Sequence, residues 1–117
     1  MSFWYLASPY SKYPAGIFAA YADACQQAAL FVRAGVPVFS PIAHSHGIAE
    51  FGDIDPADHE IWLPADAPFM DAAHGIIVCK LPGWDKSRGV QHEIEAFQSA
   101  DKPVVYMEPG VVPAVLP

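Results

Sequence analysis

The strongest constraint on the fold of this chain is an alternation of short apolar runs with segments of helical periodicity. The runs are "FWYLA" at 3–7, "VPVFS" at 36–40, "GIIVC" at 75–79 and "KPVVYM" at 102–107. Buried strands that alternate with helices are typical of a parallel sheet covered by helices on both faces. The sequence therefore predicts an α/β protein, a flavodoxin-like or Rossmann-like three-layer sandwich with a parallel sheet of four to five strands.

The segments between these runs carry helical signals. Apolar and small residues recur at helical spacing over 14–35, and again over 88–100 after the N-cap residue Ser87. A less regular helix is predicted over 55–73, where Pro64 and Pro68 are expected to break or kink it.

Two further segments lack a regular period. The Gly, Pro and His content of "PIAHSHGIAEFGDID" at 41–55 predicts a loop, and a loop of this length in a small domain is usually functional. The segment "EPGVVPAVLP" at 108–117 is interrupted by prolines, and it is predicted to add a short edge strand or to extend over a neighbouring molecule.

Composition narrows the class of protein. A length of 117 residues fits one domain over 1–117, and 53% apolar with only 16% charged residues excludes a disordered chain. A formal charge of −7 is the wrong sign for binding a nucleic-acid polymer or an anionic membrane, so neither is expected as a partner. The N-terminal segment lacks the basic flank of a signal peptide, and Cys25 and Cys79 are interpreted as reduced core thiols. A cytoplasmic protein is expected.

Glu93 is the most informative residue of the chain. It stands among Val90, Ile94 and Phe97, whose spacing marks the buried stripe of the helix over 88–100. Helical side chains lean toward the N-terminus, so the carboxylate is expected to reach a cleft at the carboxyl ends of the strands. The alternative is a rotated helix in which Glu93 is a border residue paired with a neighbouring base.

The start of the same helix is a candidate anion site. Ser87 and the backbone N–H groups of Arg88 and Gly89 form a helix N-terminus, and Lys86 adds positive charge there. Gly89 also leaves room for the side chain of Glu93. A Ser-x-Gly helix start is more often a simple cap, so the signal depends on its combination with the carboxylate.

Taken in order, these motifs resemble the nucleoside 2-deoxyribosyltransferase superfamily. The resemblance is carried by "YLASPY", a strand ending near "SPI", an Asp ahead of "GIIV", then "SRGVQHE" and "DKPVV". It is strongest to small bacterial and phage-associated members with "LPGW-x-x-S-x-G". The resemblance implies cleavage of an N-glycosidic bond with retention, through a covalent glycosyl intermediate on a Glu.

The family's catalytic roles map onto three residues. The resemblance implies that Glu93 is the nucleophile, that Asp66 manages the proton of the base, with Asp71 as its rival, and that Tyr5 positions the nucleophile. Transferases of the family carry an Asp six residues before the nucleophile, where this chain has Ser87, like the related 2′-deoxynucleoside 5′-monophosphate N-glycosidase. This favours a phosphorylated nucleotide as ligand and hydrolysis over transfer.

Other expectations follow from the loops and from the resemblance. No cofactor is expected. His44, His46 and His92 could bind zinc together with Asp53, but the preferred interpretation is that His44 or His46 lines a base pocket, and no metal is expected. Family members form dimers or larger oligomers, so a homo-oligomer is expected. The alternative to an enzyme is a nucleotide-binding module without turnover. The remaining candidate substrate-binding residues are Ser8, Tyr10 and Trp84.

Overall fold

A computed structural model describes residues 2–117 and contains a four-stranded parallel sheet in the order β2-β1-β3-β4. The predicted α/β class and parallel sheet are confirmed. The strand order reverses at β1, because β2 lies on one side of β1 whereas β3, the next strand along the chain, lies on the other side. The strands are β1 (Trp4–Ala7), β2 (Val38–Phe39), β3 (Gly75–Cys79) and β4 (Val104–Met107).

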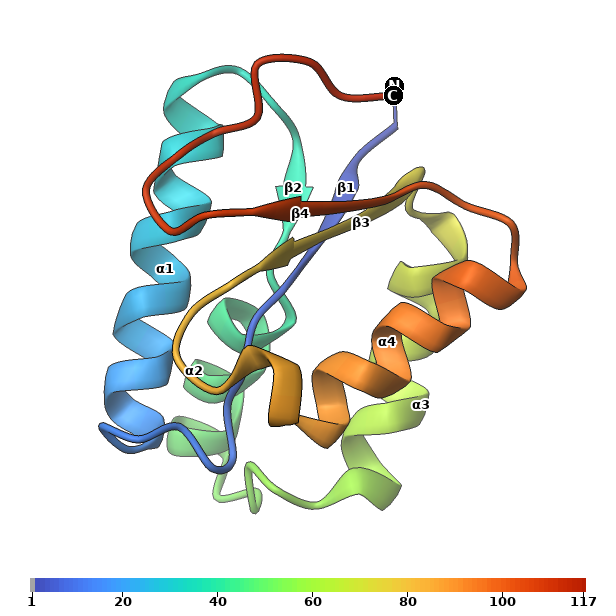
Figure 1. Cartoon of the computed structure of the whole chain (residues 1–117). Helices are drawn as coiled ribbons and strands as arrows, with labels where there is room; N and C mark the ends of the chain where they lie inside the picture. The colour runs from blue at the N-terminus through green and yellow to red at the C-terminus, as the bar shows by residue number, and fades with distance from the viewer. Residues whose placement is uncertain (1) are drawn as a thin grey trace.

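Helices cover both faces of this sheet, as a three-layer sandwich requires. Figure 1 shows α1 on one side of the sheet and α3 and α4 on the other, with α2 below the ends of β1 and β2. A short 3₁₀ turn at Trp84–Lys86 precedes α4. The α-helices are α1 (Ile17–Arg33), α2 (Pro41–Gly52), α3 (His59–Ala72) and α4 (Arg88–Ser99).

The alternation of side chains along β1 creates two separate cores. Trp4 and Leu6 join the cluster under α1, whereas Tyr5 and Ala7 join the cluster under α3 and α4. This pleat directs the Tyr5 side chain toward α4, the helix that carries Glu93.

The prediction of a loop over 41–55 is wrong for most of that segment, because residues 41–52 form α2. Ser40 caps the helix by accepting a hydrogen bond from the N–H of Ala43, and a proline follows at the first helical position. Ile42, His46 and Ala49 are buried at helical spacing. Tertiary burial of this face outweighs the weak helix propensity of a segment rich in Gly and His.

The two prolines of α3 do not break it, although the sequence predicted a break or a kink there. Pro64 and Pro68 lie inside one continuous helix, and both are exposed. The carbonyl groups that lose an amide partner belong to Glu60 and Pro64, which are also exposed, so water can satisfy them. The helix begins after Asp58, whose side chain accepts from the N–H of Glu60.

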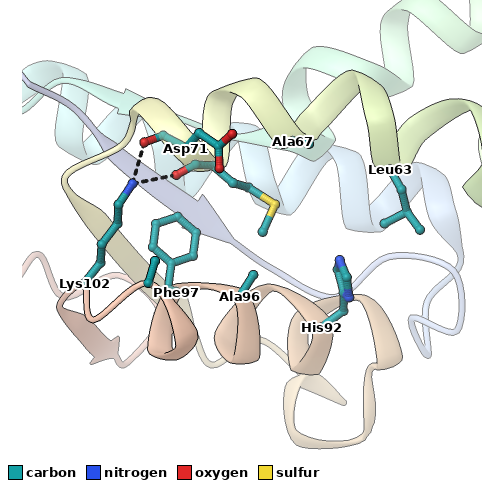
Figure 2. Close-up of a pocket in the computed structure, with 9 residues that line it drawn as sticks. Leu63, Ala67, Asp71, His92, Ala96, Phe97 and Lys102 are labelled. Carbon is teal, nitrogen blue, oxygen red and sulfur yellow. Dashed lines mark hydrogen bonds between the residues drawn. The ribbon is translucent and has the colours of Figure 1, made fainter.

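Lys102 satisfies the C-terminal end of α3. Its Nζ donates hydrogen bonds to the carbonyl oxygens of Met70, Asp71 and Ala73 at 3.1, 2.5 and 2.9 Å. Figure 2 shows the first two of these bonds at one end of the groove between α3 and α4. This contact anchors a helix that has no buried residue of its own.

The C-terminal tail forms no strand, so the predicted edge strand is absent from the described residues. Val112 and Leu116 pack against the core under α1, and the N–H of Gly110 donates to Gln27 Oε1 at 2.8 Å. In Figure 1 the tail lies at the top, whereas the loops after β1 and β3 lie at the bottom. The tail is therefore remote from the carboxyl ends of the strands. No helix within residues 2–117 is both long and apolar enough to cross a bilayer.

Gly75 sits where no larger residue fits, and Gly75→Ala is expected to destabilise the protein by about 1–3 kcal/mol. A Cβ there would lie 2.6 Å from Cζ3 of Trp4 and 2.7 Å from the carbonyl oxygen of Pro103. Gly47→Ala is the matched control, since its Cβ would meet only the Tyr21 hydroxyl at 4.0 Å and alanine is preferred inside a helix. Urea unfolding measures both, and equal stability of the two variants would contradict the packing argument.

Candidate active site

A cleft of about 740 Å³ lies where the strand order reverses. Its walls come from the loops after β1 and β3, the first turns of α2, the length of α3 and the start of α4. In open α/β sheets this is the place where ligands bind. The sequence predicted the same position from the order of the elements.

Glu93 lies in this cleft and is held by Tyr5. The hydroxyl of Tyr5, a buried residue of β1, donates a hydrogen bond of 2.5 Å to Glu93 Oε2. The alternative of a border residue paired with Lys86 or Arg88 is not found, because the ion pair among residues 2–117 is Lys80 with Glu108. The carboxylate is partly buried and directed at the sheet end, as the helical spacing predicted.

Burial sets the protonation of the two carboxyl groups of the cleft. Desolvation raises the pKa of Glu93 to about 8, although the Tyr5 hydrogen bond acts in the opposite direction. Desolvation also raises the pKa of Asp66 to about 6, and the charge of His44 lowers it. At neutral pH the pair therefore shares about one proton.

Tyr5 remains a neutral donor in this arrangement. Burial and the neighbouring charge of Glu93 raise the pKa of its hydroxyl well above the ordinary value. The proton therefore stays on the phenol, and the hydrogen bond fixes one oxygen of Glu93 while the other oxygen is left for a ligand.

The start of α4 forms one end of the cleft. Ser87 Oγ accepts from the N–H of Val90 at 3.3 Å, so its own proton is free for a ligand. Lys86, Arg88 and Gly89 line the same end. These side chains and the amides of the first helical turn suit an anion.

An apolar wall of the cleft is supplied by α2 and α3. Pro41 and Ile42 of α2 and Trp62, Leu63 and Met70 of α3 line the cleft. Trp62 Nε1 donates a hydrogen bond of 3.0 Å to the carbonyl oxygen of Asp55, which fixes the ring in place. A flat apolar group suits this wall.

Three predicted ligand contacts lie elsewhere. His46 is buried, its Nδ1 lies 2.7 Å from the Tyr10 hydroxyl, and its ring stacks on Tyr21 at 4.2 Å. His44 packs between Phe39 and Phe69, outside the cleft. Neither histidine is among the residues that line the cleft, although His46 contacts Tyr10, which does line it. A contact of either histidine with a base therefore stays a prediction.

Trp84 is the third of these residues. Its ring centroid lies 5.7 Å from that of Tyr106 and 5.9 Å from Lys80 Nζ, so it packs against the loop after β3 and against β4, and it is not among the residues that line the cleft. Ser8 and Tyr10 do line the cleft, as predicted. Lys12 and His59 also line the cleft, although sequence reasoning did not single them out as ligand-binding residues.

The structure also separates the two candidate acids of α3. Asp66 lines the cleft, whereas Asp71 lies in a groove of about 180 Å³ between α3 and α4. Figure 2 shows Asp71 beside Lys102 at one end of this groove and His92 at the other. Within residues 2–117 no cluster of three His, Cys, Asp or Glu side chains is arranged to hold a metal ion.

The fold and the site define an α/β protein with a carboxylate-lined cleft at the switch point of a parallel sheet. The chain belongs to the family described as a domain of unknown function, DUF1937, which it matches over residues 2–109. The match includes every element of the sheet and every wall of the cleft. No curated protein matches the sequence.

Proposed function

We propose that the protein cleaves the N-glycosidic bond of a (deoxy)nucleoside or nucleoside monophosphate through a covalent glycosyl intermediate on Glu93. The observation that carries the proposal is the hydrogen bond of 2.5 Å from the Tyr5 hydroxyl to Glu93, inside a cleft that Asp66 also lines. Even a partly buried carboxylate costs stability, so its retention in a cleft favours a chemical role. The resemblance to the nucleoside 2-deoxyribosyltransferase superfamily assigns the same three roles.

The reaction needs two steps. Glu93 Oε attacks the anomeric carbon, the C–N bond breaks, and the departing base takes a proton from Asp66. Asp66, now ionised, takes a proton from water as the water attacks the same carbon, and the ester bond to Glu93 breaks. In the transferase variant of this reaction, a second base replaces the water.

The polarity of the cleft supports a nucleotide as substrate. The apolar wall of α2 and α3 suits a base, and the cationic start of α4 suits a phosphate. The neutral Ser87 does not repel a phosphate, whereas the Asp that the transferases carry at this position would repel it. Hydrolysis of a phosphorylated nucleoside is therefore the preferred form of the reaction.

A homo-oligomer in the cytoplasm is part of the same proposal. Helix α3 has no buried residue, and Ile61 and Leu63 are each 45% exposed on it. Apolar side chains left open beside a cleft favour contact with a second copy of the chain.

The test is release of free base from a panel of nucleosides and nucleoside monophosphates, read by chromatography with and without an acceptor base. Release without an acceptor supports a hydrolase, and release that needs an acceptor supports a transferase. Absence of release from every substrate, with binding of a nucleotide retained, would instead identify a nucleotide-binding module.

Gly89→Ala is expected to separate stability from binding. A Cβ at Gly89 would meet only Ser87 Oγ at 3.9 Å, so the free protein accepts it, and alanine favours the helix by up to about 1 kcal/mol. The methyl group would occupy space beside the amides that face the phosphate. We expect unchanged or higher thermal stability and at least about tenfold weaker binding of 2′-deoxyadenosine 5′-monophosphate, which equals about 1.4 kcal/mol. Unchanged affinity by calorimetry would place the phosphate elsewhere, and Gly47→Ala is the control.

A further inference from the structure

Half of the basic residues of this acidic chain line one cleft. The chain has six Lys and Arg residues against thirteen acids, and Lys12, Lys86 and Arg88 are three of those six. All three are exposed, and the ion pair found among residues 2–117 involves none of them. Such a concentration in a chain of net charge −7 indicates an anionic ligand with more than one charge.

The three residues come from two loops that lie side by side. Lys86 and Arg88 follow β3, whereas Lys12 follows β1, and β1 and β3 are neighbours in the sheet. The start of α4 offers Ser87, two cations and free amides, which is sufficient for one phosphoryl group. Lys12 is a further cation on the neighbouring loop, in excess of what a single phosphate requires.

A buried hydroxyl at the start of the β1 loop has no partner. Ser8 is 6% exposed, and its Oγ is the buried side-chain N or O atom of residues 2–117 that lacks a hydrogen bond. Such an unsatisfied group costs free energy and calls for an explanation. Ser8 forms part of the wall of the cleft, on the same loop as Lys12.

We propose that the cleft binds a pyrophosphate group, with one phosphoryl group at the start of α4 and the other between Ser8 and Lys12. The substrate class is then a nucleoside 5′-diphosphate or a dinucleotide joined through a pyrophosphate. The base and sugar of this substrate class rest on the proposed function, whereas the pyrophosphate site is argued independently of it. The volume of about 740 Å³ accommodates this larger ligand.

Calorimetry with inorganic phosphate and inorganic pyrophosphate tests the site without any assumption about the base. Pyrophosphate is expected to bind at least about tenfold more tightly than phosphate, and Lys12→Gln is expected to remove this preference while changing phosphate affinity less than about threefold. Arg33→Gln is the control, because it removes the same charge on α1 outside the cleft. Equal binding of the two anions by the wild type, or an equal loss of both in Lys12→Gln, overturns the proposal.

Ser8→Ala provides a second measurement that does not depend on Lys12. Removing an unpartnered hydroxyl is expected to leave the midpoint of urea unfolding unchanged or higher, while pyrophosphate affinity falls. Unchanged pyrophosphate affinity in both variants overturns the proposal.

Adenosine 5′-diphosphate and diadenosine diphosphate distinguish a terminal from a bridging pyrophosphate. Lys12-dependent binding of either compound without release of base would leave the pyrophosphate site standing and remove the proposed function. Release of base from monophosphates, with no tighter binding of pyrophosphate than of phosphate, would support the proposed function and remove the pyrophosphate site.

Discussion

Replacement of Glu93 by glutamine is expected to lower base release by about 10³-fold or more. The amide cannot attack the anomeric carbon, yet its oxygen can still accept the hydrogen bond from Tyr5. Glu95→Gln is the matched control, since Glu95 is an exposed acid two residues along the same helix. Retention of turnover in Glu93→Gln, measured by chromatography of the free base, would exclude the covalent mechanism.

The same variant is expected to be more stable than the wild type, and the gain should depend on pH. The pKa of Glu93 is about 8 in the folded protein, above its ordinary value of 4.5. As pH rises from about 4.5 to about 8, the unfolded chain releases this proton before the folded chain does, so the stability of the wild type falls. Glutamine has no proton to release.

The free energy of unfolding, measured in urea at several pH values, should therefore diverge between the two proteins. The gap is expected to be smallest below about pH 4.5, to widen up to about pH 8 and to stay constant above it. Parallel curves for the wild type and Glu93→Gln would show that the carboxyl group is not held protonated by burial. Loss of activity together with higher stability is what a functional carboxylate predicts, because a structural one would lose stability when replaced.

The sequence predicted the sheet and the position of Glu93 on the inner face of its helix, because both depend on local periodicity. The run at 75–79 coincides with β3, and the spacing of Val90, Ile94 and Phe97 placed Glu93 correctly on the inner side of α4. Ser87 was also correctly predicted as the N-cap, since a Ser before a regular apolar stripe is a local signal.

The residues that the sequence misplaced depend on contacts between distant segments. Helix α2 is stabilised by packing on α1 and β1, which no local pattern reports, and it places His46 against Tyr21 and His44 against Phe39. Lys12 was missed because a lysine in a turn has no periodicity. Its place beside the start of α4 follows only from the pairing of β1 with β3.

The role of Asp66 is expected to show in the choice of leaving group. In Asp66→Asn, base release from an ordinary purine nucleotide should fall by about 10² to 10⁴-fold, because the departing base loses its proton donor. A nucleotide with an N7-methylated guanine already carries a positive charge on the base and needs no proton. Its hydrolysis should fall by less than about tenfold in Asp66→Asn but remain abolished in Glu93→Gln. Asp71→Asn, on the same helix but outside the cleft, is the control.

The pH dependence of the rate of base release provides a second test of the roles of Asp66 and Glu93. With pKa values of about 6 and about 8, the wild type should show a bell-shaped profile between those limits, since activity needs one proton shared by the two carboxyl groups. Asp66→Asn leaves only Glu93 to titrate, so its rate should rise with pH to a plateau and lose the alkaline decline. The midpoint should lie below about pH 8, because the charge of Asp66 no longer raises the pKa of Glu93. A shared proton fits either assignment of roles, so the methylated substrate decides: rescue of Glu93→Gln instead of Asp66→Asn would exchange the nucleophile and the acid.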